Sequence, residues 1–346
     1  MDANPSLFLF DKLFVNDRRQ KQFFHGKSIW ITGASSGIGA ELAVQAARSG
    51  VENLILSGRS QERLQSVADA CFQEQWQALS KNHSGSDNDC SSTTKISVIP
   101  LDMNAPQEKF EEAIDTLQKT LVGKHLDCVI LNAGVGQLRP AYLTHHATSC
   151  EILQVNTLAP ISLTQMLLER GILSKDKGRH IVVTSSIGAL IGVPLSASYA
   201  ASKWALHGYM NSLKAEMPWL RVDLVCPGPV DTSFHNRHVG GNNKDQTAAQ
   251  GFTKKNKDTE NPSTTRVLKM SVERCTRLYI SSLLRETGGE HWIAEQPTLF
   301  GLYLNQYFPG VFQRILTKVG PFRLKAWEEG KDLYDPDTWK NIGSKK

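Results

Sequence analysis

The chain has few of the features that mark a disulfide-stabilised or metal-binding protein. Its six cysteines are scattered over 346 residues, with no Cys-x-x-Cys pair and no cluster of cysteine with histidine. A disulfide framework and a zinc site are therefore unexpected, and free thiols in a reducing compartment are the better interpretation. The pair His145 and His146, together with His207 and Trp204, also predicts no metal site. We interpret these residues as a solvated loop, an ordinary helix histidine and a packed aromatic side chain.

Long apolar runs and strong charge are also missing. The patch "SLFLF" at 6–10 is followed at once by Asp11 and Lys12, so it is too short to span a membrane, and it lacks a signal-peptide pattern. We expect residues 1–26 to form an N-terminal tail over part of the core, with membrane contact as the alternative. The net charge of +5 is mild and lacks the clustered basic stripe of a nucleic-acid-binding protein, so no nucleic-acid partner is expected.

Short apolar runs alternate with helical patterns, an order typical of a parallel sheet with helices on both faces. Segments such as "DCVILN" and "HIVVTS" are nearly continuous in apolar residues, as strands buried on both sides are. The pattern predicts one α/β domain over 27–295. The expected strands are 28–32, 53–57, 96–101, 126–131, 179–184 and 220–226, and the expected helices are 37–49, 60–79, 106–122, 147–173 and 197–217.

Two polar stretches interrupt this alternation. Residues 80–95 are small and polar, which predicts a flexible surface insertion before the third strand. Residues 235–265 are rich in glycine, asparagine and lysine, which predicts either a lid or disorder. Residues 296–346 follow the alternating region and are interpreted as an aromatic and basic C-terminal helical extension.

The segment "ITGASSGIG" at 31–39 follows the first expected strand and opens the first expected helix. Backbone N–H groups and the positive end of the helix dipole gather at such a point and favour anions. Gly33, Gly37 and Gly39 permit positive φ and a close approach of the backbone to a pyrophosphate. The turn therefore predicts a dinucleotide site, and a tight turn without a ligand is the alternative.

The ends of the next two strands bear on the choice of dinucleotide. An NAD-binding protein would carry an acidic residue for the ribose 2′-hydroxyl at the end of the second strand, where this chain has Gly58 and Arg59. Because Arg59 offers guanidinium donors that suit a phosphate dianion, we predict NADP(H) over NAD(H). The alternative is an arginine that caps a surface turn. Asp102, after the third strand, can accept a hydrogen bond from adenine or cap the following helix.

A possible acid–base site lies later in the chain. Tyr199 and Lys203 are four residues apart in "SYAASK", so a helix would place them on one face. A neighbouring ammonium group favours the phenolate and lowers the tyrosine pKa, which is ordinarily about 10. Ser186 ends an expected strand, and its hydroxyl can bind the same substrate oxygen, although Ser185 competes for this role. Asn156 can hold a carbonyl group or a water that links to Lys203.

Taken together and in order, these motifs resemble the classical branch of the short-chain dehydrogenase/reductase family. The resemblance covers about 27–295, and it departs from the family at Leu131, where a second asparagine is more usual. It implies a Rossmann-type doubly wound parallel sheet, a single domain, and hydride transfer between a nicotinamide and a substrate carbon. The matching residues are Thr32, Gly33, Gly37, Gly39, Asp102, Asn132-Ala133-Gly134 after the fourth strand, Asn156, Ser186, Tyr199, Lys203 and "PGPVDT" at 227–232.

The resemblance also implies a role for each site residue. Tyr199 gives or takes the hydroxyl proton and Ser186 orients the substrate oxygen. Lys203 lowers the tyrosine pKa and holds the nicotinamide ribose, Asn156 anchors a water chain, and Thr232 bonds the nicotinamide amide or a phosphate oxygen. The expected cofactor-binding residues are Thr32, Gly33, Ser35, Ser36, Gly37, Ile38, Gly39, Arg59, Asp102, Asn132, Ala133, Gly134, Tyr199, Lys203, Pro227, Gly228, Val230 and Thr232.

The C-terminal extension is similar to the dehydrogenase/reductase member 7 subgroup of that family, through Gln296-Pro297, Tyr303-Leu304, Gln306-Tyr307 and Pro309. The subgroup is usually attached to the endoplasmic reticulum and reduces steroid, retinoid and related lipophilic carbonyls. Because its N-terminal anchor is not seen here, we expect a cytoplasmic protein, peripheral to the endoplasmic reticulum or another membrane. The aromatic and basic residues of 297–327 fit an interfacial membrane surface. The alternative is packing on the substrate pocket or on a second subunit of a homodimer.

Three functions are compatible with these features. The first is an NADP(H)-dependent oxidoreductase that interconverts a lipophilic alcohol and its ketone or aldehyde, and the intact set of site residues favours it. The second is a catalytically weak NADPH-binding scaffold or sensor. The third is an extended-type epimerase or dehydratase. It is disfavoured because enzymes of that type have a different glycine spacing and a substantial C-terminal substrate domain, whereas the extra length of this chain is split between loops and a tail.

Overall fold

The structure is a computed structural model that describes residues 17–82, 94–121, 123–176, 179–236, 269–284 and 288–334. Most of the expected insertion at 80–95 and of the expected lid at 235–265 lies outside the described residues. Seven parallel strands form one sheet in the order β3-β2-β1-β4-β5-β6-β7. The strands β2 and β3 lie on one side of β1 and the strands β4 to β7 lie on the other, so the strand order reverses between β1 and β4. The strands are β1 Ser28–Thr32, β2 Asn53–Ser57, β3 Lys95–Val98, β4 Cys128–Leu131, β5 His180–Thr184, β6 Arg221–Pro227 and β7 Glu290–Ile293.

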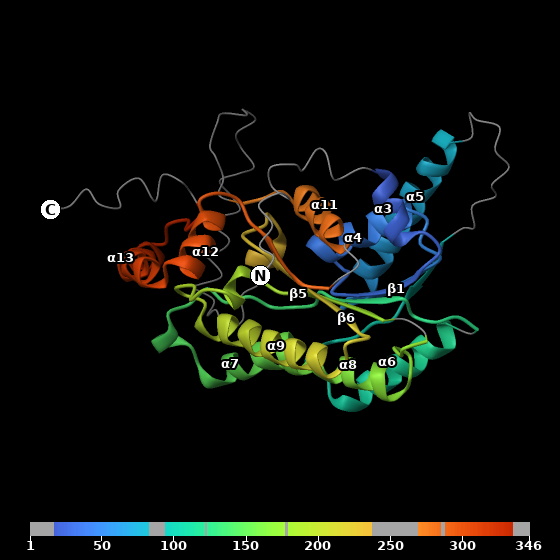
Figure 1. Cartoon of the computed structure of the whole chain (residues 1–346), viewed down its shortest axis with the longest axis horizontal. Helices are drawn as coiled ribbons and strands as arrows, with labels where there is room; N and C mark the ends of the chain where they lie inside the picture. The colour runs from blue at the N-terminus through green and yellow to red at the C-terminus, as the bar shows by residue number, and fades with distance from the viewer. Residues whose placement is uncertain are drawn as a thin grey trace.

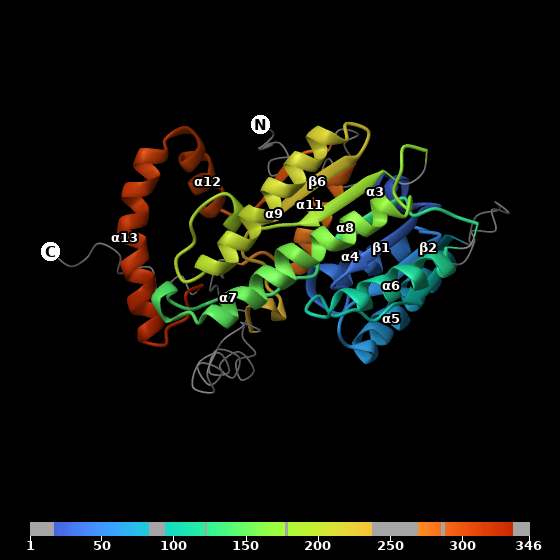
Figure 2. The same cartoon turned by 90° about the horizontal axis from the view of Figure 1, so that it is seen from below.

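Helices cover both faces of the sheet, as Figures 1 and 2 show. This arrangement confirms the predicted doubly wound α/β fold. One layer contains α3 (Asp17–Phe24), α4 (Gly37–Arg48), α5 (Gln61–Asn82) and α11 (Val272–Leu283), and the other contains α6 (Gln107–Thr120), α7 (His146–Leu153), α8 (Ala159–Glu169) and α9 (Ala197–Glu216). Three short 3₁₀ turns, η1 (Ala141–Leu143), η3 (Ile187–Ala189) and η4 (Ser233–Asn236), follow β4, β5 and β6.

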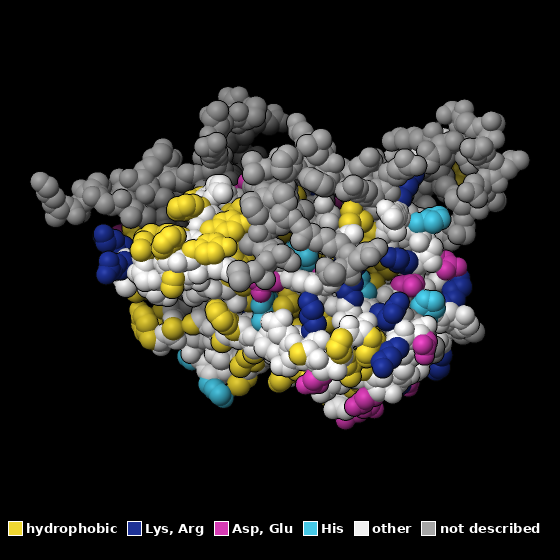
Figure 3. All heavy atoms as spheres, in the orientation of Figure 1, with side chains coloured by type: hydrophobic (Ala, Val, Ile, Leu, Met, Phe, Trp, Pro, Cys, Tyr) yellow, Lys and Arg dark blue, Asp and Glu magenta, His cyan; other side chains and the backbone are white. Residues whose placement is uncertain are grey.

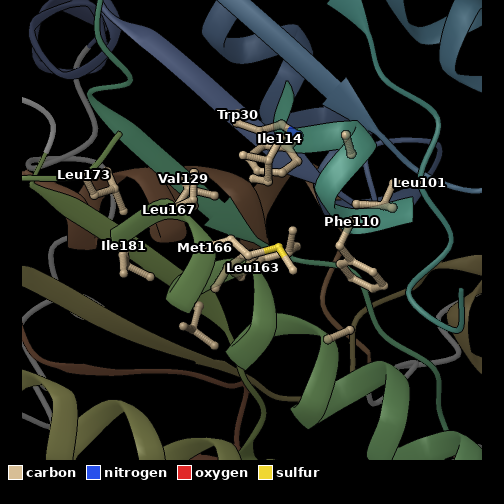
Figure 4. Close-up of a cluster of buried hydrophobic side chains, with 14 of the residues drawn as sticks. Trp30, Leu101, Phe110, Ile114, Val129, Leu163, Met166, Leu167, Leu173 and Ile181 are labelled. Atoms are coloured by element: carbon tan, nitrogen blue, oxygen red, sulfur yellow. The ribbon is translucent and has the colours of Figure 1, made fainter. Parts of the chain in front are cut away.

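A hydrophobic core fills each side of the sheet. Below the sheet in Figure 1, side chains of α6, α8 and α9 pack against β4 and β5, and Figure 4 shows this cluster around Leu163, Met166 and Leu167. On the other side, Phe23 and Phe24 of α3 are buried with α4 and α11. Because the strands are covered on both faces, all five residues of β1, β2 and β5 are buried, as their continuous apolar runs predict.

The predicted single helix at 147–173 is wrong in its interior. The structure has α7, then a π-helical segment, η2 (Gln154–Leu158), and then α8. Pro160 lies in the first turn of α8, and it has no N–H to continue an i→i−4 ladder. The wider turn before the proline accommodates this break, and it carries Asn156, one of the predicted site residues.

A buried charge network joins β5, β6 and β7. The Asp223 carboxylate accepts hydrogen bonds from His180 (2.7 Å), Arg221 (2.8 Å), His291 (2.7 Å) and the Gly289 N–H (3.1 Å). Burial alone would raise the pKa of Asp223, but the hydrogen bonds from the two histidines and the charge of Arg221 hold it well below its ordinary value. The network stabilises the half of the sheet that includes β7, a strand the sequence did not predict.

The C-terminal extension forms two helices, α12 (Thr298–Tyr307) and α13 (Pro309–Glu328). They lie beside one end of the sheet, in the orange and red part of Figures 1 and 2. Within the described residues, no helix is long and apolar enough to cross a membrane.

Candidate active site

A cavity of about 520 Å³ opens at the carboxyl ends of the strands. Its walls come from the turns after β1, β2, β4, β5 and β6, from the start of α9, and from α12 and α13. Open α/β sheets bind ligands at this edge, near the point where the strand order reverses. The cavity is lined by every predicted site residue except Thr32, Gly39 and Asn156.

The glycine turn after β1 is shaped by positive φ and by close packing. Gly33 has φ of 66° and Gly37 has φ of 58°, both in the left-handed region that favours glycine. A Cβ atom on Gly33 would lie 2.7 Å from the Ala133 Cα atom, so only glycine fits there. The turn thus brings its backbone to the cavity just where α4 begins.

Thr32, Asn132 and Gly39 hold this turn in place, and of these three Asn132 alone lines the cavity. The Thr32 hydroxyl accepts the N–H groups of Asn132 (3.0 Å) and Ala133 (3.2 Å). The Asn132 Nδ2 atom donates to the carbonyl oxygens of Thr32 and Gly33, each at 3.2 Å. A Cβ atom on Gly39 would lie 2.5 Å from both Asn132 Nδ2 and the Gly33 oxygen. These residues therefore clamp the glycine turn to the end of β4.

Arg59 and Asp102 lie on the wall where the dinucleotide's adenosine half is expected. Arg59 is exposed after β2, next to Gly58, and both line the cavity. Asp102 Oδ1 accepts the Asn104 N–H at 3.0 Å, ahead of α6. The N-cap residue of α6 is Pro106, so the alternative in which Asp102 caps that helix is wrong, and its place on the cavity wall leaves adenine recognition open.

Tyr199 and Lys203 lie one turn apart on α9 and face the end of β5. Tyr199 is hydrogen-bonded to Ser186, whose oxygen also accepts the Gly188 N–H at 3.1 Å. The Lys203 ammonium donates to the Thr184 carbonyl oxygen at 3.0 Å and lies 5.9 Å from the centre of the Tyr199 ring. The phenol, hydroxyl and ammonium groups are thus collected on one wall of the cavity.

Ser185, the competitor for the serine role, is turned to a different partner. Its hydroxyl lies 2.7 Å from His207 Nε2 in the interior. The structure therefore pairs Ser186, and not Ser185, with Tyr199.

Burial shifts the pKa values of both Tyr199 and Lys203. It raises the pKa of Tyr199 to about 12, although the hydrogen bond with Ser186 acts in the opposite direction. Burial also lowers the pKa of Lys203 to about 8. The expectation that Lys203 lowers the tyrosine pKa stays a prediction.

Asn156 is fully buried beside the cavity. Its Oδ1 atom accepts the Val135 N–H at 2.8 Å, and its Nδ2 atom donates to the Val135 carbonyl oxygen and to the Ser202 hydroxyl, each at 3.0 Å. Both amide donors are therefore used to hold the segment after β4 against α9. The water chain implied by the family resemblance stays a prediction.

A further part of the cavity wall comes from α13. Phe312, Ile315, Leu316 and Val319 line the cavity at i, i+3, i+4 and i+7, the spacing of one helix face. Tyr334, beyond the end of α13, also lines it. The extension thus lines the cavity, as in the alternative in which it packs on the substrate pocket.

Comparisons with known proteins show the family to which the chain belongs. The family model described as short chain dehydrogenase matches residues 27–241. The chain is 32% identical over 314 residues to human "Dehydrogenase/reductase SDR family member 7", covering 88% of this chain and 80% of that protein. It is 28% identical over 209 residues to a 3-ketodihydrosphingosine reductase of Dictyostelium discoideum, covering 60% of each.

Among solved structures, an alcohol dehydrogenase from the archaeon Thermococcus sibiricus, complexed with 5-hydroxy-NADP, shares the fold. Its TM-score is 0.59 at 22% identity, over 78% of this chain and 97% of that one. The chain therefore belongs to the short-chain dehydrogenase/reductase family, oxidoreductases that act on CH–OH groups with a nicotinamide dinucleotide.

Proposed function

We propose that this protein interconverts a lipophilic alcohol and its ketone or aldehyde, with NADP(H) as the preferred cofactor and Tyr199 as the acid/base group. The observation that carries the proposal is the grouping of Tyr199, Ser186 and Lys203 on the wall of a cavity that apolar side chains of α13 also line. The nicotinamide, when bound, supplies the hydride to the substrate carbon or removes it.

The glycine turn supports a dinucleotide in this cavity. Side chains at Gly33 and Gly37 would be strained by the positive φ, and the α4 N-terminus that follows favours a pyrophosphate. Gly58 leaves room beside Ser35, and Arg59 offers its guanidinium to a 2′-phosphate. We assign the adenine side to Asp102 and the nicotinamide side to the segment 227–232, in which Thr232 lines the cavity.

At the reacting end, the chain's own groups bind and protonate the substrate oxygen. The Ser186 and Tyr199 hydroxyls would both hydrogen-bond to that oxygen, which fixes its distance from the phenol proton. With a pKa of about 12, Tyr199 carries its proton at neutral pH, and with a pKa of about 8, Lys203 is mostly an ammonium group. In this state Tyr199 can donate its proton to the oxygen of a bound carbonyl substrate.

The tail supports a lipophilic substrate and a location at a membrane surface. Phe300, Tyr307 and Phe308 are each 62% exposed, and Figure 3 shows hydrophobic side chains gathered on the surface over α12 and α13. Arg314 and Lys318 of α13 add charge that suits anionic headgroups. We propose peripheral attachment, on the cytoplasmic side, to the endoplasmic reticulum or another membrane.

A homodimer is the proposed assembly. Trp204 is 53% exposed on α9, and Leu158 is 52% exposed on the same layer, so the expectation of a packed tryptophan is wrong. An exposed apolar pair of this kind fits a subunit interface. Sedimentation of the purified protein measures the oligomeric state. In the same experiment, Trp204→Ser should shift a dimer toward monomer.

The proposal is tested with purified protein and a panel of lipophilic ketones, aldehydes and alcohols, with NADPH, NADH and their oxidised forms. Tyr199→Phe should abolish turnover while the Kd for NADPH stays within a few-fold, because the ring remains and only the proton donor is lost. Near-normal turnover of that variant would refute the assigned donor. Binding of NADPH with no turnover of any panel member would favour the scaffold or sensor.

A further inference from the structure

Three residues of α9 contact three consecutive residues at the end of β5. Tyr199, Lys203 and His207 are spaced four residues apart and share one face of the helix. Tyr199 is hydrogen-bonded to Ser186, Lys203 donates to the Thr184 carbonyl oxygen, and the third contact is that of His207 with Ser185. The first two contacts belong to the catalytic group, and the third has no role in the function proposed above.

The third contact continues into a polar network. Ser185 is only 5% exposed, and its hydroxyl lies 2.7 Å from His207 Nε2. The other ring nitrogen of His207, Nδ1, lies 3.5 Å from a carboxylate oxygen of Glu290 on β7. The second Glu290 oxygen accepts the indole N–H of Trp292 at 2.5 Å. Both ring nitrogens of a buried histidine are therefore used, which fixes the plane of its ring.

The network also reaches the C-terminal extension. The Trp292 ring lies 5.5 Å from the ring of Tyr303 in α12. Trp292 and Tyr303 pack against a buried cluster that includes Ile187, the residue directly after Ser186. The backbone of Ser186 is thus held on both sides, at Ser185 by His207 and at Ile187 by the cluster around α12.

We propose that Ser185, His207 and Glu290 are positioning residues that hold the Ser186 hydroxyl against Tyr199. This inference rests on the proposed roles of Ser186 and Tyr199 in the reaction. The network acts through the backbone: His207 fixes the Ser185 side chain, and the Ser185 N–H is bound to the Val225 carbonyl oxygen at 2.7 Å. Catalysis by a hydroxyl and a phenol on one substrate oxygen is sensitive to displacements of about 1 Å or less.

The sequence alone treats His207 as an ordinary helix histidine, and its surroundings show a different role. The carboxylate that orients it comes from β7, a strand that only the three-dimensional structure places beside α9. Glu290 has 34% of its side chain exposed, and its pKa, which burial would raise, is lowered overall by hydrogen bonds from His207 and Trp292. The carboxylate therefore stays charged and keeps His207 oriented at neutral pH.

The test compares two substitutions at His207. His207→Phe keeps the ring volume and removes both polar contacts, whereas the amide of His207→Gln can still reach the Ser185 hydroxyl. We expect His207→Phe to lower kcat at least tenfold while the Kd for NADPH stays within twofold, and we expect His207→Gln to recover kcat to within about threefold of the wild type. His125→Phe is the matched control, since His125 is an exposed histidine before β4.

A second pair of measurements separates positioning from stability. Rates are referred to the folded fraction found by thermal unfolding, and Ser185→Ala should lower kcat by a similar factor with little loss of stability. Because both variants remove one shared contact, the double variant of Ser185→Ala and His207→Phe should lose no more than either alone. Unchanged kcat in both single variants, or a Gln variant as slow as the Phe variant, would overturn the proposal.

A structural measurement makes the outcome independent of the proposed activity. In a crystal structure of His207→Phe, the Ser186 hydroxyl should have moved away from the Tyr199 phenol, while His125→Phe should leave that contact intact. An unchanged contact in His207→Phe overturns the positioning role, even if no substrate is found. A wild-type protein without turnover, combined with a displaced Ser186 in the variant, counts against the proposed function alone.

Discussion

The clamp behind the glycine turn makes a specific prediction for Gly39→Ala. A methyl group at this position would lie 2.5 Å from Asn132 Nδ2 and 2.5 Å from the Gly33 carbonyl oxygen. One of these atoms is backbone and cannot move aside like the end of a flexible side chain. The substitution must therefore displace either the Asn132 amide or the turn itself.

The magnitude follows from opposing contributions. Overpacking costs about 1–3 kcal/mol, and loss of the two Asn132 hydrogen bonds from a partly buried amide costs about 1–3 kcal/mol. Alanine in place of glycine within α4 returns about 1 kcal/mol of helix propensity. We therefore expect a net loss of about 3 kcal/mol in the free energy of unfolding, together with at least a tenfold weaker affinity for NADPH.

Gly208→Ala is the matched control for this experiment. Gly208 is an exposed glycine within α9, and a Cβ atom there would meet no atom within 4 Å. The same chemical change should therefore stabilise the protein by up to about 1 kcal/mol. Urea unfolding gives the free energies, and quenching of protein fluorescence by NADPH gives the Kd. If Gly39→Ala matched Gly208→Ala in both measurements, the clamp would not shape the turn and the reasoning would fail.

Three further changes test other parts of the structure. Arg59→Ala should weaken the binding of NADPH by about 1.5–3 kcal/mol and leave the binding of NADH nearly unchanged. Equal losses of affinity in titrations with the two cofactors would contradict phosphate recognition by Arg59. Asp223→Asn should destabilise the fold by about 3–5 kcal/mol, because it leaves Arg221 and two histidines around a neutral amide, whereas Asp115→Asn, in an exposed pair with Arg170, should cost less than about 1 kcal/mol in the same urea series. Since the Asp223 pKa is depressed in the folded state, its contribution is present above the ordinary value of about 4 and is lost as the pH falls below it, which acid unfolding of wild type and variant would reveal. The rate of carbonyl reduction should fall as the pH rises through about 8, where Lys203 loses its charge, and a flat pH profile to pH 10 would rule out that assignment.

The sheet could be predicted from the sequence where its strands are buried on both faces. Strands β1, β2 and β5 consist of residues that are all buried, and their apolar runs mark them clearly. Strand β7 was missed because it has four residues, "EHWI", of which Glu290 and His291 are polar. Both side chains bind partners from α9 and β6 that are remote in sequence, so no local pattern could identify the strand.

The site could be predicted where spacing along one element fixes which groups meet. Tyr199 and Lys203 are four residues apart on one helix and therefore share a helix face. Ser186 follows a strand whose end faces that helix. The choice between Ser185 and Ser186 is made by His207, which engages the Ser185 hydroxyl. The sequence predicts the packing of α13 on the pocket only as one alternative, because the path from β7 to α13 depends on packing of Trp292 and the α12 side chains and not on a motif.

Burial changes the protonation states expected of Tyr199 and Lys203, the proposed catalytic pair. The sequence argument considered only the attraction between an ammonium group and a phenolate, which lowers the tyrosine pKa. Burial acts on both groups and disfavours both charged forms, so it raises the pKa of Tyr199 to about 12 and lowers that of Lys203 to about 8. The neutral phenol beside an ammonium group is then the stable state near pH 7. In that state the tyrosine can donate its proton, and the ammonium group, 5.9 Å from the ring, would stabilise the phenolate that donation leaves behind. We therefore propose that Lys203 acts mainly through the charge that appears during proton transfer.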